Sequence, residues 1–321
     1  SFGYEAATRT VRETMGTRFY KTVVDGAGRP VQFGLGNLTP SQFSYDGNGR
    51  LTQILRGSRR VTIAYDAQHR PSIVTDPLNH EIRFEYDEAG RIVAQTAGGR
   101  ATRFTYDDNG NVTSVSPPER PDHTFTFTPL DLVDNYAPPA VAGTGATIYR
   151  YNRDRQIVSI DRPDGQTIGF EYDPAGRPAR LSFSRGDLEF GYDTAGRLSG
   201  ITAPDGADLQ FSYDGFLPTA ERWRGAVEGV VERTFGTDLL VRTERVNGAH
   251  DVTSSFYDAN GLPGTVGELS VTRHPDTAEV TQARLRGTVE SRSYDSLGEL
   301  AQLSAPGYSA FYTRDPLGRI T

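Results

Sequence analysis

Apolar and polar residues alternate along short stretches of the chain. In one such stretch Ile168, Phe170 and Tyr172 occupy every second position, and small or polar residues stand between them. In an extended strand this spacing places all three side chains on one face. Asp173 to Gly176 then fit a β-turn in which the aspartate accepts hydrogen bonds from the following amides and the glycine takes a left-handed conformation. The stretch therefore predicts one β-hairpin.

The same hairpin pattern returns every 20 or 21 residues, which indicates a repeat architecture. A Tyr-Asp pair occurs nine times, usually with an apolar residue two positions before the tyrosine and often with a glycine three positions after the aspartate. We expect stacked hairpins whose equivalent tyrosines point to one side of a continuous sheet. The repeat-signature residues, to which we assign a structural role, are Tyr45, Asp46, Gly49, Tyr65, Asp66, Tyr86, Asp87, Gly90, Tyr106, Asp107, Gly110, Tyr172, Asp173, Gly176, Tyr192, Asp193, Gly196, Tyr213, Asp214, Tyr257, Asp258, Tyr294 and Asp295.

The period weakens in two parts of the chain. Residues 116–146 carry six prolines, and proline removes the amide that a central strand needs. We therefore expect a loop insertion there, with an embedded strand around Phe125 and Phe127. Residues 215–293 are expected to hold degenerate repeats.

Two sites depart from the turn pattern itself. His69 stands where most repeats have glycine, and we interpret it as a turn residue because histidine tolerates left-handed geometry better than most residues. Thr237 and Asp238 lie about midway between Tyr213 and Tyr257, so we interpret them as an eroded Tyr-Asp pair.

The composition favours a thin sheet. With Gly (35 residues) counted and Tyr (16 residues) left out, the apolar share is roughly 42%, below the ~45–50% usual for globular domains. This fits a sheet with wet surfaces better than two layers pressed together. The net charge of −7, from 34 basic and 41 acidic residues, argues against non-specific nucleic-acid binding. Lys21 is the only lysine, and we expect the turn arginines to bridge neighbouring repeats.

Several kinds of site are excluded by residue content. The chain has no cysteine, so disulfides, iron–sulfur clusters and thiolate zinc sites are ruled out. No apolar run approaches the ~18 residues that a membrane-spanning helix needs. The repeat is already under way at the first residues and still running at the last, so we expect an excerpt from a longer polypeptide.

The sequence carries no established catalytic motif. The repeated aspartates could form a carboxylate ladder that binds cations or supplies an acid and base pair. The alternative that we favour is that each aspartate caps its own turn, which explains its fixed position. The chain has no Gly-x-Ser-x-Gly, no His-Glu-x-x-His and no phosphate-binding glycine loop. We assign no catalytic, cofactor-binding or metal-ligating residue.

The recurring Tyr-Asp-x-x-Gly-Arg, as in Tyr172 to Arg177, resembles the YD-repeat or Rhs (rearrangement hot-spot) proteins over nearly the whole chain. The resemblance implies a curved, spiralling antiparallel sheet of hairpins, part of a hollow β-shell, with residues 1–321 as a single shell segment. In bacterial polymorphic toxins such a shell encloses a C-terminal effector, and in teneurins it belongs to an adhesion apparatus. Rhs toxins cleave themselves near Asp-Pro-x-Gly-Leu, but here Arg319 stands at the leucine position, so we interpret Asp315 to Gly318 as a hairpin turn.

These observations lead to one main functional hypothesis. The chain is expected to be a non-catalytic wall segment that encloses a toxin or other effector, and its partners would be the remainder of its own polypeptide. The alternative is an adhesion or carbohydrate-binding module of teneurin-like type that contacts a cell-surface protein or glycan, and an enzyme is the third class considered. We expect no cofactor, nucleic acid or membrane span, a secreted or cell-surface bacterial location, and unpaired edge strands through which copies could associate.

Overall fold

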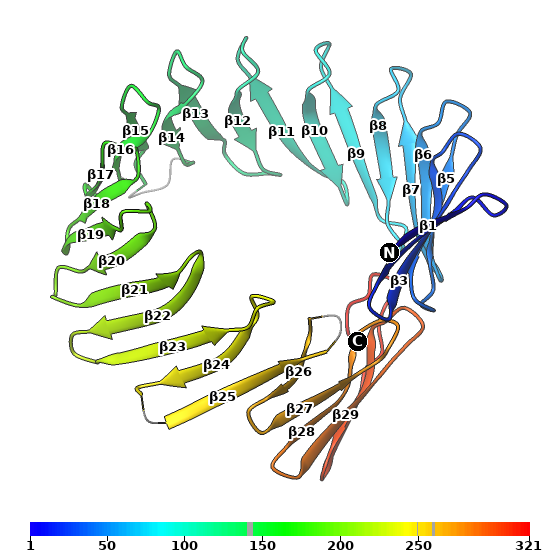
Figure 1. Cartoon of the computed structure of the whole chain (residues 1–321). Coiled ribbons are helices and arrows are strands. Elements are labelled where there is room, and N and C mark those ends of the chain that lie inside the picture. The colour runs from blue at the N-terminus through cyan, green and yellow to red at the C-terminus, as the bar shows by residue number, and fades with distance from the viewer. Residues whose placement is uncertain (140–143, 249, 259–260) are drawn as a thin grey trace. The chain divides into compact units, whose positions relative to one another are not determined.

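The chain is built from β-hairpins alone (Figure 1). The computed structural model describes residues 1–139, 144–248, 250–258 and 261–321. None of these residues lies in a helix, so no helix of the described chain could cross a membrane. The all-β antiparallel fold predicted from the alternation is confirmed. The chain forms two units, Ser1–Phe84 with Thr253–Thr321 and Glu85–Val252.

The first unit contains two runs of strands, and within each run strands that follow one another in sequence pair antiparallel. The first run comprises β1 (Phe2–Glu5), β2 (Thr10–Met15), β3 (Arg18–Val24), β4 (Pro30–Leu35), β5 (Ser41–Tyr45), β6 (Leu51–Arg56), β7 (Arg59–Tyr65), β8 (Pro71–Thr75) and β9 (Glu81–Tyr86). The second run comprises β25 (His250–Tyr257), β26 (Pro263–Val266), β27 (Leu269–Arg273), β28 (Val280–Leu285), β29 (Thr288–Tyr294), β30 (Leu300–Ala305) and β31 (Tyr308–Phe311). The unit boundaries in sequence fall inside β9 and β25.

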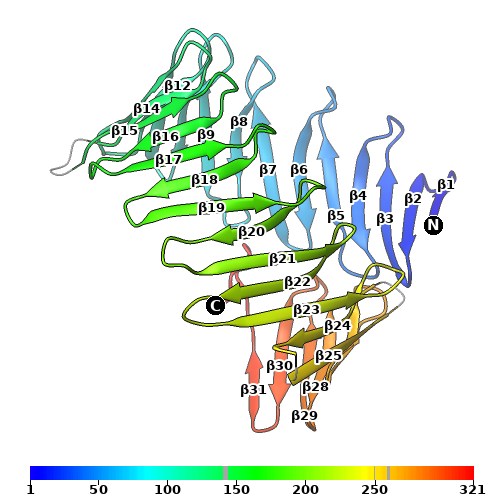
Figure 2. The same ribbon diagram turned by 60° about the vertical axis from the view of Figure 1, so that its left-hand side comes forward.

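The second unit is one antiparallel series in which each strand pairs with the next, as the successive hairpins in Figure 2 show. Its strands are β10 (Ile92–Ala97), β11 (Arg100–Tyr106), β12 (Val112–Ser116), β13 (His123–Phe127), β14 (Val133–Ala137), β15 (Thr147–Tyr151), β16 (Ile157–Asp161), β17 (Thr167–Tyr172), β18 (Pro178–Phe183), β19 (Gly186–Tyr192), β20 (Leu198–Thr202), β21 (Asp208–Asp214), β22 (Leu217–Arg224), β23 (Gly229–Phe235) and β24 (Val241–Val246).

A β-bulge accompanies the signature tyrosine. Ser44 lies opposite Gln53 and Tyr45 lies opposite Leu51, so Thr52 is an extra residue on the return strand. The same shift occurs at Tyr65, Tyr106, Tyr151, Tyr172, Tyr192, Tyr213, Tyr257 and Tyr294. Bulges bend a strand and increase its right-handed twist. Each hairpin therefore carries the same local bend at the same end.

The proline-rich stretch contains more strand structure than its sequence predicts. Instead of a loop with one strand it contains the paired strands β13 and β14. Phe127 takes the tyrosine position, and Thr128 takes the aspartate position, where its hydroxyl accepts hydrogen bonds from the amides of Leu130 and Leu132. Asp131 takes the glycine position with a φ of 59°. The prolines lie outside these two strands, so they remove no ladder hydrogen bond there.

The degenerate repeat between Tyr213 and Tyr257 is also displaced from its predicted position. The turn begins at Gly236, whose amide donates to the Leu240 carbonyl at 2.9 Å, and Phe235 takes the tyrosine position. The assignment of Thr237 and Asp238 to the Tyr-Asp pair is therefore wrong by two residues, because the true pair has lost both signature side chains.

The sheet is a single layer. Ala94 is the only apolar residue with a buried side chain among those described, and no large side chain there is fully buried. The solvent-accessible surface is 20106 Å², whereas a compact protein of 35.2 kDa exposes about 13,000 Å². The prediction that the hairpins do not press together into a two-layer sandwich is confirmed.

The turn glycines take the left-handed conformation that the pattern predicts. The φ angle is 81° at Gly49, 82° at Gly90 and 77° at Gly176. His69 occupies the same slot with a φ of 68°, which confirms its interpretation as a turn residue. In contrast Gly191 lies inside β19 and is not left-handed.

We predict that Gly90→Ala lowers the free energy of unfolding by about 1–2 kcal/mol, because a Cβ at a left-handed residue meets the following carbonyl oxygen. Added atoms at Gly90 contact nothing within 4 Å, so backbone strain would be the only cause. Gly191→Ala is the matched control, since its Cβ would come no closer than 3.4 Å to another atom. Urea denaturation of both variants measures the difference, and equal losses would contradict the turn assignment.

Candidate functional site

Each regular turn is closed by its aspartate. At Asp46, the carboxylate oxygen Oδ1 accepts hydrogen bonds from the amides of Asn48 and Arg50, both at 2.9 Å. The other oxygen, Oδ2, accepts from Nε of Arg50 at 2.7 Å. The amide of Gly49 donates to the Asp46 carbonyl at 3.0 Å. Turns of the same design begin at Asp25, Asp66, Asp87, Asp173, Asp193 and Asp315.

These hydrogen bonds lower the pKa of the turn aspartates. At Asp46 the amide of Arg50 is the largest cause, and the guanidinium of Arg50 adds to it against the opposing effect of burial. At Asp173 the guanidinium of Arg177 is the largest cause of the lowered pKa, followed by the Arg177 amide. The carboxylates are therefore held ionised and already bonded, which suits a turn cap and does not suit a general acid or base.

The arginine that ends each turn also contacts the next repeat. The guanidinium of Arg50 lies 4.5 Å from the ring centroid of Tyr65, and its NH1 lies 2.6 Å from Nδ1 of His69. The Tyr65 hydroxyl donates to the Leu51 carbonyl at 2.7 Å, directly after Arg50. The predicted bridging role of the turn arginines is thus present. Equivalent stacked pairs are Arg29 with Tyr45, Arg91 with Tyr106, Arg177 with Tyr192 and Arg197 with Tyr213.

The signature tyrosines each make the same kind of hydrogen bond. Each hydroxyl donates to the first backbone carbonyl of the preceding return strand at 2.7–2.8 Å. The bond is made by Tyr45, Tyr65, Tyr106, Tyr151, Tyr172, Tyr192, Tyr213 and Tyr294. Since the direction of the bond repeats, these rings occupy equivalent places within their units.

The remaining signature residues differ in detail. Asp258 and Asp295 cap turns that end in Leu262 and Glu299 instead of arginine. Asp107 accepts from the side chain of Asn111 at 3.0 Å, again in place of arginine. Asp214 does not cap a four-residue turn: it is the last residue of β21, opposite Leu217 across a two-residue turn. Among the described residues no group of three or more His, Asp or Glu is arranged to hold a metal ion.

One turn in the first unit ends in an acidic residue where the regular turns end in arginine. This turn contacts the other run of strands. Glu299 stands in the arginine position of its repeat and Arg314 stands in the next tyrosine position, where its NH1 donates to the Leu300 carbonyl at 2.6 Å. Arg59, at the start of β7, binds both carboxylate oxygens of Glu299, at 2.6 and 2.7 Å. Arg314 lies 3.5 Å from the same carboxylate. The pKa of Glu299 is lowered, above all by its hydrogen bond with Arg59.

Further hydrogen bonds between the two runs of strands support this contact. The amide of Thr39 donates to the Ser296 carbonyl at 2.7 Å, and the guanidinium of Arg56 donates to the Leu297 carbonyl at 2.8 Å. The side chain of Asn37 donates to Asp276 at 3.0 Å. We call the Arg59, Glu299 and Arg314 cluster the charge latch of the first unit.

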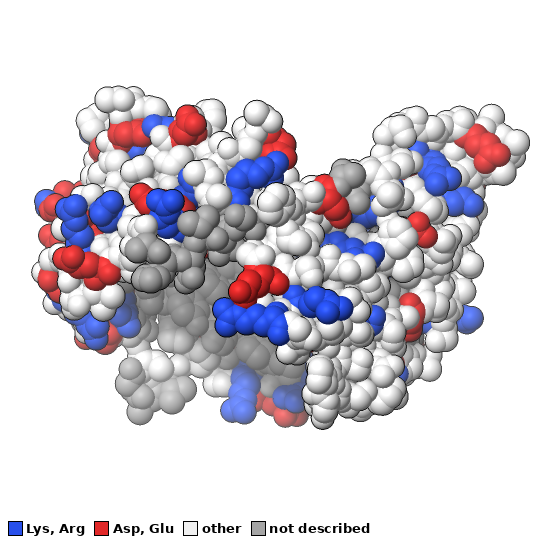
Figure 3. Space-filling model, turned by 60° about the horizontal axis from the view of Figure 1, so that its bottom comes forward, with Lys and Arg blue, Asp and Glu red and all other residues white. Residues whose placement is uncertain are grey.

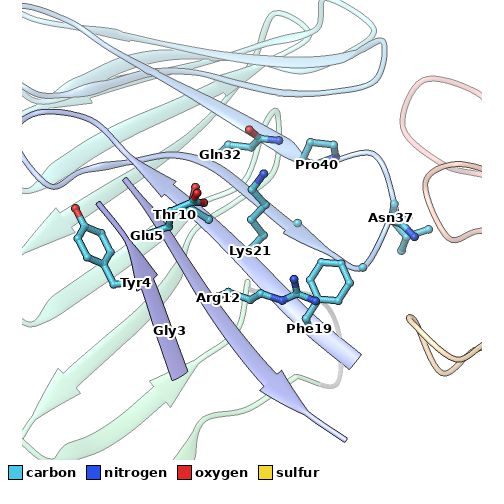
Figure 4. Close-up of a pocket in the computed structure, with 13 residues that line it drawn as sticks. Gly3, Tyr4, Glu5, Thr10, Arg12, Phe19, Lys21, Gln32, Asn37 and Pro40 are labelled. Carbon is cyan, nitrogen blue, oxygen red and sulfur yellow. The ribbon is translucent and has the colours of Figure 1, made fainter. Parts of the chain in front are cut away.

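A pocket of about 610 Å³ opens on strands β1–β4 and on the segment that follows β4 (Figure 4). In the view of Figure 4 the side chain of Arg12 extends to the ring of Phe19, and the side chain of Lys21 points toward Gln32 and Pro40. The guanidinium of Arg12 lies 4.0 Å from the ring centroid of Phe19. The sequence pattern does not predict this pocket, because the residues that line it come from four strands and the segment after β4 and lie outside the repeat signature.

Basic and acidic residues are interspersed on the surface outside these sites. Figure 3 shows basic and acidic side chains in small interspersed groups on the face that it presents. Many are partners of one another, as in the pair of Arg233 with Glu221 and Glu244, both at 2.8 Å. Such a distribution does not create the clustered positive charge that phosphate backbones require.

We predict that acid weakens the fold through the turn aspartates. Their pKa is lowered in the folded chain, so they stabilise it above the ordinary value of 3.8, and this contribution is lost as the pH falls through the folded pKa. Asp173→Asn should lower the denaturation midpoint at pH 7, and the loss should be smaller at pH 2.5, which lies below the ordinary aspartate pKa. A loss of equal size at both pH values would show that the charge of Asp173 is not what stabilises the turn.

A second prediction concerns the charge latch. Glu299→Arg with Arg314→Tyr converts this turn to the ordinary repeat pattern, with Asp295 available to pair locally, while it places a cation opposite Arg59. The free energy that protects the Thr39 amide from hydrogen exchange should fall by about 1.5–3 kcal/mol, the range for hydrogen bonds to charged groups.

Two comparisons make this latch experiment specific. Adding Arg59→Glu should restore part of the protection, and exchange at Gly176 in the second unit should not change. Unchanged exchange at Thr39 in the double variant would show that backbone contacts alone hold the two runs together.

The chain is similar to known proteins that share these hairpins. The teneurin YD-shell family matches residues 1–309. The double-stranded DNA deaminase toxin A of Burkholderia cenocepacia is 29% identical over 155 residues, which are 48% of this chain and 11% of that protein.

Solved structures share the fold at low sequence identity. A crystal structure of TcdB2-TccC3-TEV superposes on all of this chain with a TM-score of 0.64 and 12% identity. A Tc holotoxin pore of Photorhabdus luminescens covers 98% of it with a TM-score of 0.61 and 13% identity. The chain spans 22% and 20% of those structures' chains. With its repeated capped turns, its arginine bridges and a family match from residue 1 to residue 309, this chain belongs to the teneurin YD-shell family.

Proposed function

We propose that the chain is a non-catalytic wall segment of a shell that encloses a toxin or other effector polypeptide of its own longer chain. The observation that carries this proposal is the single-layer sheet. In the described residues its strands pair with the strands next to them in the chain, and it buries almost no apolar side chain of its own. Such a sheet has two free faces, so it can separate one compartment from another.

The comparisons support this role. The chain matches a shell family along nearly its whole length and resembles parts of toxin proteins, of which it spans 11% to 22%. We infer that the rest of the shell and the enclosed polypeptide lie elsewhere in the parent protein, which would be secreted or displayed at the bacterial surface.

The state of the acidic residues supports a non-catalytic role. The turn carboxylates are bonded to amides and arginines and have lowered pKa values. None is prepared to accept and donate a proton near neutral pH.

One observation favours the alternative, an adhesion or carbohydrate-binding module. A pocket of about 680 Å³ in the second unit is lined by His123, Phe125, Tyr136, Tyr149 and Tyr151. The rings of Phe125 and Tyr136 stack with centroids 5.1 Å apart. Nδ1 of His123 lies 2.8 Å from the Tyr136 hydroxyl. These half-buried rings combine apolar faces with polar tips, a combination suited to stacking on a sugar ring.

Limited proteolysis of the full-length parent polypeptide would distinguish the two roles. Under enclosure, the segment after the shell should be digested far more slowly than the same segment expressed alone, because the wall excludes the protease. Opening the charge latch by Glu299→Arg with Arg314→Tyr should accelerate this digestion, while Gly191→Ala should not. Equal digestion rates for the attached and the isolated segment would contradict enclosure and favour the alternative.

A further inference from the structure

Two cations face each other in one row across the first four strands. Arg12 on β2 lies directly opposite Lys21 on β3, Gly3 on β1 lies opposite Arg12, and Gly34 on β4 lies opposite Lys21. Residues directly opposite in an antiparallel ladder project from the same face, and like charges there repel each other. The row therefore has two cationic side chains at its centre, which repel each other, and a glycine without a side chain at each end.

Neither cation is neutralised by the described part of the chain. No described carboxylate lies within ion-pair distance of Arg12 or Lys21, whereas the turn arginines each have an aspartate partner. The one acid in the pocket, Glu5, accepts a hydrogen bond from the Thr8 hydroxyl at 2.8 Å. Lys21, the single lysine of a chain with a net charge of −7, thus lies beside an arginine that also has no ion-pair partner among the described residues.

The pocket is open beside Arg12 and closed beside Gly34. A Cβ at Gly3 would meet nothing within 4 Å, so the space beside Arg12 is open. On the other side Pro40 closes the pocket, with its Cβ 3.1 Å from where a side chain at Gly34 would begin. Phe19 stacks against the guanidinium of Arg12, which fixes one face of the guanidinium and leaves its N–H edge free.

We propose that this pocket binds a single carboxylate, the side chain of an aspartate or glutamate in an extended polypeptide. The guanidinium of Arg12 donates to both carboxylate oxygens, the ammonium of Lys21 donates to one of them, and Phe19 and Pro40 contact the methylene groups of the acid. With Glu5 at the rim the pocket carries one net positive charge, which matches a carboxylate better than a doubly charged phosphate. The proposal rests on the proposed function only for the source of the acid, a polypeptide held against the wall.

The single lysine provides a direct test. Lysine-selective isotope labelling of the 321-residue chain gives one lysine side-chain signal in an NMR spectrum. The probe is the blocked peptide acetyl-Gly-Glu-Gly-amide, with acetyl-Gly-Gln-Gly-amide as the neutral control. The glutamate peptide should shift the Lys21 signal and the glutamine peptide should not, and added salt should weaken the effect.

Variants separate binding from folding. Arg12→Gln should weaken the binding of the glutamate peptide by at least about tenfold, since a charge-assisted hydrogen bond is lost. The control Arg60→Gln, an exposed arginine on β7 outside the pocket, should not change it. Lys21→Gln should keep or raise the thermal stability of the free chain because it removes a repulsion.

Three results would overturn the proposal. They are a Lys21 signal that ignores the glutamate peptide, an equal response to the glutamine peptide, and a response to inorganic phosphate that exceeds the response to the peptide. The last would assign the pocket to free phosphate. Because none of these measurements involves an enclosed polypeptide, their failure would leave the enclosure proposal intact, and failure of the proteolysis experiment would leave the carboxylate site intact.

Discussion

The contact that the arginine of each regular turn makes with the next hairpin is the interaction on which the rest of the structure depends. A single-layer sheet cannot rely on a buried core, so its hairpins must be held together by what passes between neighbours. Arg50 shows how this is done: Asp46 of its own turn holds its Nε, and the ring of Tyr65 in the next hairpin receives its flat face. One side chain thus completes a turn and fixes the position of the following repeat.

This arrangement also explains how the fold tolerates altered repeats. Where Asn152 and Gln156 replace aspartate and arginine, Gln156 still donates to the Gly176 carbonyl at 2.7 Å. Arg314 replaces a tyrosine and still reaches the carbonyl that the tyrosine hydroxyl would reach. In these two altered repeats a donor that spans the gap between hairpins is kept, and residue types other than the usual one supply it.

The sequence predicted the hairpins because their alternation and turn chemistry are local, and a resemblance to a known family extended that prediction to a shell. The bulge at each tyrosine was missed, although its signal is present: on the return strands apolar residues stand three positions apart, as at Val112 and Val115 or Leu198 and Ile201. The repeat at Phe127 does not show the signature, because Phe127, Thr128 and Asp131 stand at its tyrosine, aspartate and glycine positions. The pocket with Arg12 and Lys21 was not predictable, because it depends on the register of four strands.

The charge latch makes the contact between the two runs of the first unit specific to one turn. Arg59 and Glu299 are 240 residues apart in sequence, and an ordinary turn would offer Arg59 an arginine that repels it. A repeat with the usual arginine therefore cannot take the place of the Glu299 repeat at this contact, although both form the same hairpin. In a chain of similar hairpins, one exchange of charge is enough to distinguish a single repeat from the others.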